Sequence, residues 1–315
     1  MFCVKRIYIR DLQKYRTNTM KPRFSASEVA SLLGLNPYKS KNETLVKVLS
    51  MLPKFKPIIL GVKEGLGART DREVVAQASP SVLKAMYESV DIAVASTSDS
   101  QMEKAINTFK KTHIRQVIQE TLEGKRTPVS DDVKAAVQRI STGESTVEAE
   151  TVCREVVASI ENTQEHQVLA SEIQKRRGIR LEDKAENTHA AETGKEVTDR
   201  NTFTEFECPE YRLIGYLDGM QDGKVVETKN RKRFWVTPPA YDFIQLRCYM
   251  FMKGKKDGLL LENFPGKPPR TTPVPWDDRM WGEIHDGLCD VSRTIQNITE
   301  EDARSLAHTV FSASM

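Results

Sequence analysis

The clearest hydrophobic pattern in the chain is a pair of runs rich in apolar and β-branched residues within residues 211–233. Asp222-Gly223 separates the two runs and can supply the positive φ angles of a tight two-residue turn. This stretch is therefore predicted to be a β-hairpin. With Asp222 and Gly223 as the loop residues, Gln221 pairs with Lys224, and that pairing sets the register of both arms.

The expected register brings charged residues together. Asp218 lies opposite Glu227, and Tyr216 lies opposite Lys229. Because side chains alternate faces with period two, Asp218, Glu227 and Lys229 share one face. Directly opposed residues have Cβ atoms about 4.5–5.5 Å apart, where like charges destabilise a sheet. The two carboxylates therefore indicate a cation between them, and oxygen ligands suit a hard ion such as Mg²⁺. In the competing interpretation, Asp218 belongs to an Asp-Gly turn, and Glu227 and Lys229 form a solvated cross-strand pair.

Helical patterns occupy most of the remaining chain, with polar breaks and Pro or Gly at their ends. Ser25 and Glu28 have the spacing of a capping box. Residues 61–69 are expected to form a loop and residues 266–275 an extended connector. Helices are predicted over residues 26–33, 42–51, 80–95, 100–123, 130–143, 145–176, 176–194, 238–254, 277–297 and 299–310, and strands over 203–208 and 255–264.

Composition narrows the classes of protein without choosing one. The chain has 315 residues, of which 29% are charged and 39% hydrophobic, as is typical of a soluble globular protein. Its net charge of +3 gives no global basic field, so any affinity for nucleic acid must come from a local patch. The five cysteines are scattered along the sequence, which disfavours a zinc knuckle or iron–sulfur motif and suits a reducing compartment. No apolar run reaches the roughly 18–20 residues of a membrane span. We expect an intracellular protein, in the cytoplasm or nucleus of a host cell.

Two polar residues on predicted helices are further candidates for chemistry. Glu182 lies on the helix just before the hairpin, where it could be an outer metal ligand. The alternative is a surface glutamate in an i,i+4 pattern. Gln245 is a polar residue on the mostly apolar helix 238–254. It could bond a catalytic lysine or a substrate, or be half exposed.

Contacts to phosphate are expected at two places. The N-terminus of helix 26–33 carries two serines and follows two cations, an arrangement that can hold a phosphate. The run after the hairpin offers cations for DNA phosphates and the aromatic rings of Phe234 and Trp235 for a frayed base. A solvated turn is the alternative for this run. The candidate DNA-binding residues are Lys21, Arg23, Ser25, Ser27, Arg231, Lys232 and Arg233.

Four stretches in this order resemble the YqaJ / phage-lambda-type exonucleases, viral recombinases of the PD-(D/E)xK nuclease superfamily. They are FSASEVASLLGLNPY, RGIRLEDKAE, GYLDG with VVETKNR, and the helix of Gln245. The resemblance covers roughly residues 20–50 and 175–255. It implies an α/β fold with a PD-(D/E)xK restriction-endonuclease-like core, in which a mixed central sheet is flanked by helices. Residues 1–60 and 175–315 would form this core. The helical block of residues 61–174 exceeds what the family leads us to expect, and we interpret it as a large insertion or a subdomain.

The resemblance also implies a role for each site residue. It makes Lys229 the catalytic lysine, Gln245 the active-site glutamine, and Lys21 or Arg23 the contact to a 5′ phosphate. Leu217 stands where the family commonly has proline, which is not a ligand. The implied metal ligands are the side chains of Asp218 and Glu227, the main-chain carbonyl of Thr228, and Glu182 near a second ion.

The function expected from this resemblance is a Mg²⁺-dependent DNA nuclease in which Mn²⁺ can substitute. It would be a 5′→3′ exonuclease on double-stranded DNA ends, serving viral recombination or replication. Lys229 would position or deprotonate the attacking water, or screen charge on the phosphate. A single-strand annealing protein is an implied partner, and the family's toroidal trimers imply a homo-oligomer, although the sequence displays no subunit interface. Two alternatives stay open: a structure-specific or restriction-like endonuclease of the same superfamily, and a non-catalytic DNA-binding or scaffold protein that works through its helical block.

Overall fold

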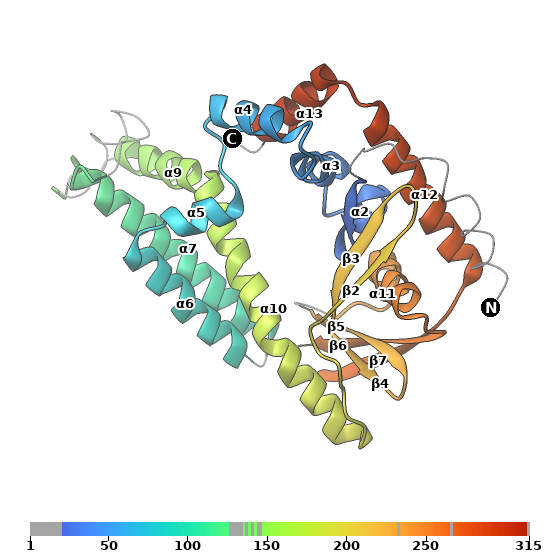
Figure 1. Ribbon diagram of the computed structural model, residues 1–315. Helices are drawn as coiled ribbons and strands as arrows, with labels where there is room; N and C mark the ends of the chain where they lie inside the picture. The colour runs from blue at the N-terminus through green and yellow to red at the C-terminus, as the bar shows by residue number, and fades with distance from the viewer. Residues whose placement is uncertain are drawn as a thin grey trace.

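The computed structural model describes residues 21–96, 98–125, 135, 138–139, 142–143, 147–231, 234–264 and 267–313. Most of the helix predicted over 130–143 lies outside these residues. Figure 1 shows a helical part on one side and a mixed α/β part on the other. The long helix α10 (Gln164–Thr193) runs from the first part into the second. The predicted boundary between residues 174 and 175 therefore falls inside one continuous helix.

The helical part has its own apolar core, formed where α6 and α7 pack against the first half of α10. Met86, Phe109 and Leu169 are fully buried there. Thr163 caps α10, and its hydroxyl accepts a hydrogen bond from the His166 backbone N–H at 3.3 Å. A single helix over 145–176 is therefore a wrong prediction, because this cap begins a new helix. The helices are α5 (Asp71–Gln77), α6 (Pro80–Ala95), α7 (Asp99–Leu122), α9 (Val147–Glu161) and α10.

The strands form two mixed sheets instead of the single central sheet that we expected. In one sheet the order is β1-β3-β2, with β1 parallel to β3. In the other the order is β4-β5-β6-β7, with β5 parallel to β6. The chain passes from one sheet to the other at Asp218, between β3 and β4. The strands are β1 (Arg23–Ser25), β2 (Thr202–Glu207), β3 (Arg212–Leu217), β4 (Gly219–Gln221), β5 (Lys224–Asn230), β6 (Asp257–Phe264) and β7 (Lys267–Pro275).

The predicted turn is confirmed, but the hairpin is shorter than expected. Asp222 and Gly223 both have positive φ, at 47° and 77°, and Gln221 pairs with Lys224. The ladder between β4 and β5 ends at Gly219. Beyond that point β3 pairs with β2, so the predicted pairing of Tyr216 with Lys229 is wrong.

Helix α11 (Ala240–Lys253) covers the inner face of the β3 sheet. Leu246, Tyr249 and Met250 are buried on it, whereas Phe243, which we also expected on the buried face, is half-buried. Gly215 of β3 allows this close packing, since a Cβ there would lie 2.5 Å from Tyr249 Cε1. The other elements of this part are η1 (Ala26–Glu28), α2 (Val29–Leu32), α3 (Lys41–Ser50), α4 (Lys56–Gly65), α12 (Asp278–Asn297) and α13 (Glu300–Ser312).

Three local predictions are wrong. Residues 61–65 belong to helix α4 and not to a loop. The Ser25–Glu28 capping box is absent, because the Glu28 carboxylate instead accepts hydrogen bonds from two lysines, Lys39 and Lys47, at 2.6 and 2.7 Å. Within the expected connector 266–275, residues Lys267–Pro275 form the edge strand β7. Prolines are tolerated there because one side of the strand has no partner strand among the described residues.

Candidate functional site

Asp218 sits where the chain crosses between the two sheets, and β5 holds it in place. Its Oδ2 accepts a hydrogen bond from the backbone N–H of Thr228 at 2.7 Å. Thr228 is flanked on β5 by Glu227 and Lys229. A single hydrogen bond thus ties Asp218 to the strand that carries the other two predicted site residues, although Asp218 itself belongs to neither ladder.

Lys229 connects β5 to α11. Its Nζ donates to Glu227 Oε1 at 2.5 Å and to Gln245 Oε1 at 3.2 Å. The Glu227 side chain is 1% exposed and the Lys229 side chain 24%. This lysine is therefore not part of the solvated cross-strand pair of the competing interpretation, since its carboxylate partner is fully enclosed.

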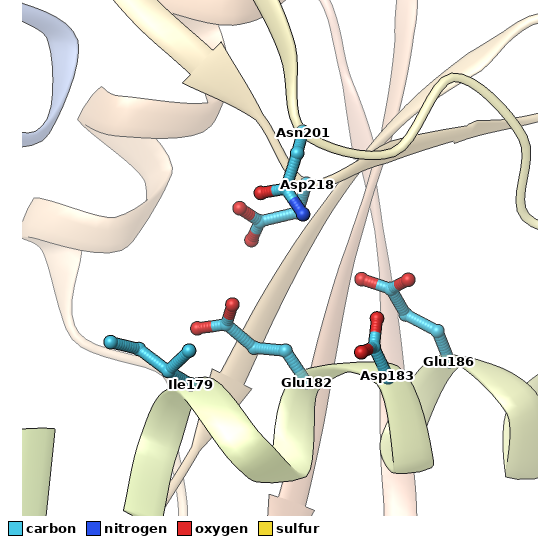
Figure 2. Close-up of a pocket in the computed structure, with 6 residues that line it drawn as sticks. All are labelled: Ile179, Glu182, Asp183, Glu186, Asn201 and Asp218. Carbon is cyan, nitrogen blue, oxygen red and sulfur yellow. The ribbon is translucent and has the colours of Figure 1, made fainter. Parts of the chain in front are cut away.

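The carboxylates of α10 face the same region from below. Glu182 and Glu186 are one helical turn apart, and in Figure 2 the Glu182 carboxylate points toward Asp218. A small pocket of about 90 Å³ lies between α10 and the sheet junction. It is lined by Ile179, Glu182, Asp183, Glu186, Asn201 and Asp218.

Burial raises the pKa values of these acids. Burial, reinforced by the charge of Asp218, raises the pKa of Glu182 to about 7. Burial also raises the pKa of Glu186 to about 7, although Arg200 and Thr228 oppose the shift. The pKa values of Asp218 and Glu227 are raised as well, mainly by burial. The site thus holds more negative charge than its own groups balance.

Lys229 keeps its proton in this setting. Burial acts to lower the pKa of Lys229, but the charges of Glu227, Asp218 and Asp242 outweigh burial and raise it above the ordinary value. A general base would need a lowered pKa. The ammonium is therefore placed to orient oxygen atoms and to screen negative charge.

The donor set fits a divalent cation. Among the described residues, no group of three or more His, Cys, Asp and Glu side chains already has the arrangement of a metal site. Glu227 Oε2, however, is buried and has no hydrogen-bond partner within the described parts of the chain. An unsatisfied buried carboxylate oxygen is costly, and a cation would satisfy it. Asp218, Glu227 and the Thr228 carbonyl offer the oxygen ligands that Mg²⁺ and Mn²⁺ accept, with water completing the shell.

Glu186 is a site residue that our sequence analysis missed. Its carboxylate accepts a hydrogen bond from Thr228 Oγ1 at 3.2 Å and pairs with Arg200 Nε at 2.9 Å. It therefore supports the residue whose backbone binds Asp218. The available signal was its position four residues after Glu182, on the same side of the helix.

The structure places the candidate DNA-binding residues in different surroundings. Lys21 pairs with Glu207 at 2.7 Å on the surface, and Arg23 donates to Met51 Sδ at 3.2 Å. The hydroxyls of Ser25 and Ser27 lie 3.0 Å apart. In the parallel ladder Ser25 lies opposite Ile214, four residues before Asp218, and Arg23 lies opposite Arg212, six residues before it. Lys232 and Arg233 lie outside the described residues.

Arg231 is an internal cation in this structure. Its guanidinium bonds Asp242 Oδ2 at 2.5 Å and Glu262 Oε1 at 2.9 Å, and its side chain is only 10% exposed. Arg270 adds a second bond to Glu262, at 2.7 Å. We correct the expectation of a DNA contact here: Arg231 joins β5, β6 and α11 and helps to hold β5 in place.

Comparisons with known proteins give a distant structural likeness. No protein-family model and no curated protein matches the chain. Part of it is similar to the crystal structure of an alkaline exonuclease, LHK-Exo, from Laribacter hongkongensis, with 18% identity and a TM-score of 0.34 over 44% of this chain and 75% of that one. The structure of LHK-Exo in complex with dAMP has 17% identity and a TM-score of 0.33, over 44% of this chain and 74% of that one. The crystal structure of SSO0001 has 18% identity and a TM-score of 0.31, over 58% of this chain and 86% of that one. The likeness is too weak to carry any conclusion about this chain, whose described residues define a mixed α/β protein.

Proposed function

We propose that this protein is a Mg²⁺-dependent DNA nuclease with a PD-(D/E)xK-type site. One observation carries the proposal: Asp218, Glu227 and Lys229 meet around Thr228, with an unsatisfied carboxylate oxygen among them. The half-buried Asp218, the buried Glu227 and a lysine two residues after it are the groups of a PD-(D/E)xK-type site. The sequence resemblance to the lambda-type exonucleases supports the same reading.

The acids would hold the ion, and the ion would supply Lewis-acid activation of water and charge neutralisation at the phosphate. Asp218 and Glu227 would ligate it through carboxylate oxygens, with the Thr228 carbonyl as a main-chain ligand. Glu182 would approach a second ion from α10. The hydrogen bond from Thr228 N–H keeps Asp218 oriented, so this ligand is preorganised before the substrate arrives.

Lys229 would act as a fixed positive charge. Its raised pKa keeps it protonated near neutral pH. Glu227 Oε1 accepts its hydrogen bond, and Glu227 Oε2 would be the oxygen available to an ion. Lys229 could then donate to the attacking water or to a phosphate oxygen, while Gln245 holds the ammonium in place. Positioning, screening and deprotonation of the water are all kept as proposed roles, because the carboxylate charges that raise the pKa of Lys229 are the ones that an ion would neutralise.

The finer description is a 5′→3′ exonuclease acting on duplex ends in viral recombination or replication. Polarity, end preference and the annealing-protein partner rest on the sequence resemblance alone. Lys21, Arg23, Ser25 and Ser27 remain candidates for the terminal phosphate. Ser25, opposite Ile214, is at the end of β1 nearer to Asp218, whereas Arg23, opposite Arg212, is at the farther end.

The test compares linear and circular duplex DNA with Mg²⁺ or with EDTA. We expect degradation of linear DNA only, abolished by EDTA and in Lys229→Ala. Asp222→Asn is the matched control, because it removes one carboxylate from the same hairpin at an exposed turn position where asparagine tolerates positive φ. Cut circles would indicate an endonuclease. Full activity in Lys229→Ala would refute the proposed site.

A further inference from the structure

Two aromatic side chains are exposed beside the acidic pocket. Phe203 of β2 and Tyr216 of β3 are directly paired across the antiparallel ladder. Their rings meet edge to face, with centroids 5.4 Å apart. Phe203 is 46% exposed and Tyr216 is 62% exposed. These rings are solvent-facing and do not belong to an apolar core cluster.

The register ties this pair to the pocket. Asp218 follows Tyr216 by two residues, and Asn201 precedes Phe203 by two residues. Asn201 and Asp218 lie just beyond the ends of the two strands, next to the last ladder pair, Thr202–Leu217. Asn201 and Asp218 line the pocket. The two rings are therefore only two residues along the chain from residues of the pocket.

The opposite face of the same strands is closed by α11, since Gly215 packs against Tyr249. The open face has little net charge beyond the rings: in the following part of the ladder, Glu205 and Arg212 pair with one another. Ile179 of α10, 65% exposed, adds another apolar group at the pocket. A partly aromatic surface, on which Glu205 and Arg212 pair with each other, thus borders a strongly acidic one.

We propose that Phe203 and Tyr216 form a stacking subsite for a nucleobase of the DNA whose phosphate lies at the pocket. This inference rests on the proposed function and specifies its substrate as an unpaired or frayed nucleotide. The charge pattern favours this occupant. A phosphate would bind at the cation held by the acids. The base of the same nucleotide is neutral and presents a π face, so it would stack on the neighbouring rings.

The experiment measures binding separately from cleavage. Single-stranded oligonucleotides carry 2-aminopurine at the first, second or third position from the 5′ end, with Ca²⁺ in place of Mg²⁺. Stacking on an aromatic ring quenches 2-aminopurine emission. We expect quenching by the wild-type protein at one or more positions. In Tyr216→Ala and Phe203→Ala that quenching is lost, and binding weakens by roughly tenfold per stacking contact removed.

Matched variants separate stacking from bulk and from misfolding. Tyr216→Phe keeps the ring and should behave as wild type, whereas Tyr216→Leu keeps apolar bulk and should not quench. Tyr87→Ala removes an exposed aromatic side chain from α6 in the helical part and should leave both readouts unchanged. Circular dichroism checks that each variant is folded.

Each outcome decides one of the two proposals. Unchanged quenching and affinity in the Ala variants would overturn the subsite, even if the protein cleaves DNA. Ring-dependent quenching without cleavage in any metal would support the subsite and overturn the nuclease. Sedimentation adds a third arm: if Tyr216→Ala converts a wild-type oligomer to monomer without affecting 2-aminopurine, the rings cover a second copy of the chain and the subsite is refuted.

Discussion

Replacing Lys229 with methionine should destabilise the protein in a pH-dependent way. Methionine keeps much of the apolar stem and removes the ammonium. In the folded state Glu227, 1% exposed, loses its 2.5 Å ion-pair partner. Asp218 loses the nearby charge that opposes the rise in its pKa. The fold then encloses two carboxylates with no cation between them.

The magnitude depends on whether Glu227 stays ionised. Removing one partner of a buried ion pair costs about 3–5 kcal/mol when the remaining charge is uncompensated. Protonation of Glu227 would reduce this cost, because the neutral carboxyl group needs no cation. Each unit by which the pKa is raised corresponds to about 1.4 kcal/mol. Burial already raises the pKa of Glu227, and loss of Lys229 raises it further. A raised folded-state pKa gives stability that is present at low pH and lost as pH rises through that pKa. We therefore expect a loss of about 3 kcal/mol near pH 9 and clearly less near pH 6.

Urea unfolding followed by circular dichroism measures this free energy. A cycle of Lys229→Met, Glu227→Gln and the double variant isolates the coupling between the two side chains. In the Glu227→Gln background, Lys229→Met should cost less and lose most of its pH dependence. An equal cost in both backgrounds, or a Lys229→Met variant as stable as wild type at every pH, would refute the reasoning.

Three further changes probe the frame around the site. Gly215→Ala should cost about 1–3 kcal/mol in urea unfolding, because its Cβ would lie 2.5 Å from Tyr249 Cε1; wild-type stability would contradict that packing. Arg231→Met should lower the free energy of unfolding by about 3–5 kcal/mol, because it leaves the buried Asp242 carboxylate unpaired. The affinity of this variant for DNA in Ca²⁺ should equal that of the wild type. Weaker DNA binding by a variant of wild-type stability would instead make Arg231 a DNA contact. Burial, with His113 nearby, lowers the pKa of His166 from 6.5 to about 4, so stability present above the ordinary pKa is lost as pH falls through this range, by up to about 3 kcal/mol. His166→Gln should flatten that slope in urea titrations between neutral pH and about pH 4.5, and an unchanged slope would exclude His166 as its source.

The hairpin and its acids could be predicted because their determinants are local. Asp222-Gly223 specifies the turn, and period two places Glu227 and Lys229 on one face. Gln245 was found from its contrast with an apolar helix, and the structure bonds it to Lys229. The same local rules made the predicted hairpin too long. Nothing in the sequence near Asp218 indicates that the chain pairs with β2 before this residue and with β5 after it.

Non-local partners account for most of the remaining misses. Arg231 looks like a surface cation in sequence, and only the fold brings Asp242 and Glu262 against it. Glu28 has the spacing of a capping residue but lies beside two lysines from the following segment. The role of Glu186 depends on α10 lying against β5, which no pattern within the helix encodes.

The central claim is that the acids at the sheet junction hold a divalent ion, and the most direct test is Mn²⁺ binding followed by the electron paramagnetic resonance of the free ion. The account predicts that the wild-type protein takes up at least one Mn²⁺ per chain, that Asp218→Asn loses this uptake, and that the turn variant Asp222→Asn keeps it. Absence of uptake by the wild type, or equal uptake by Asp218→Asn, would contradict the account.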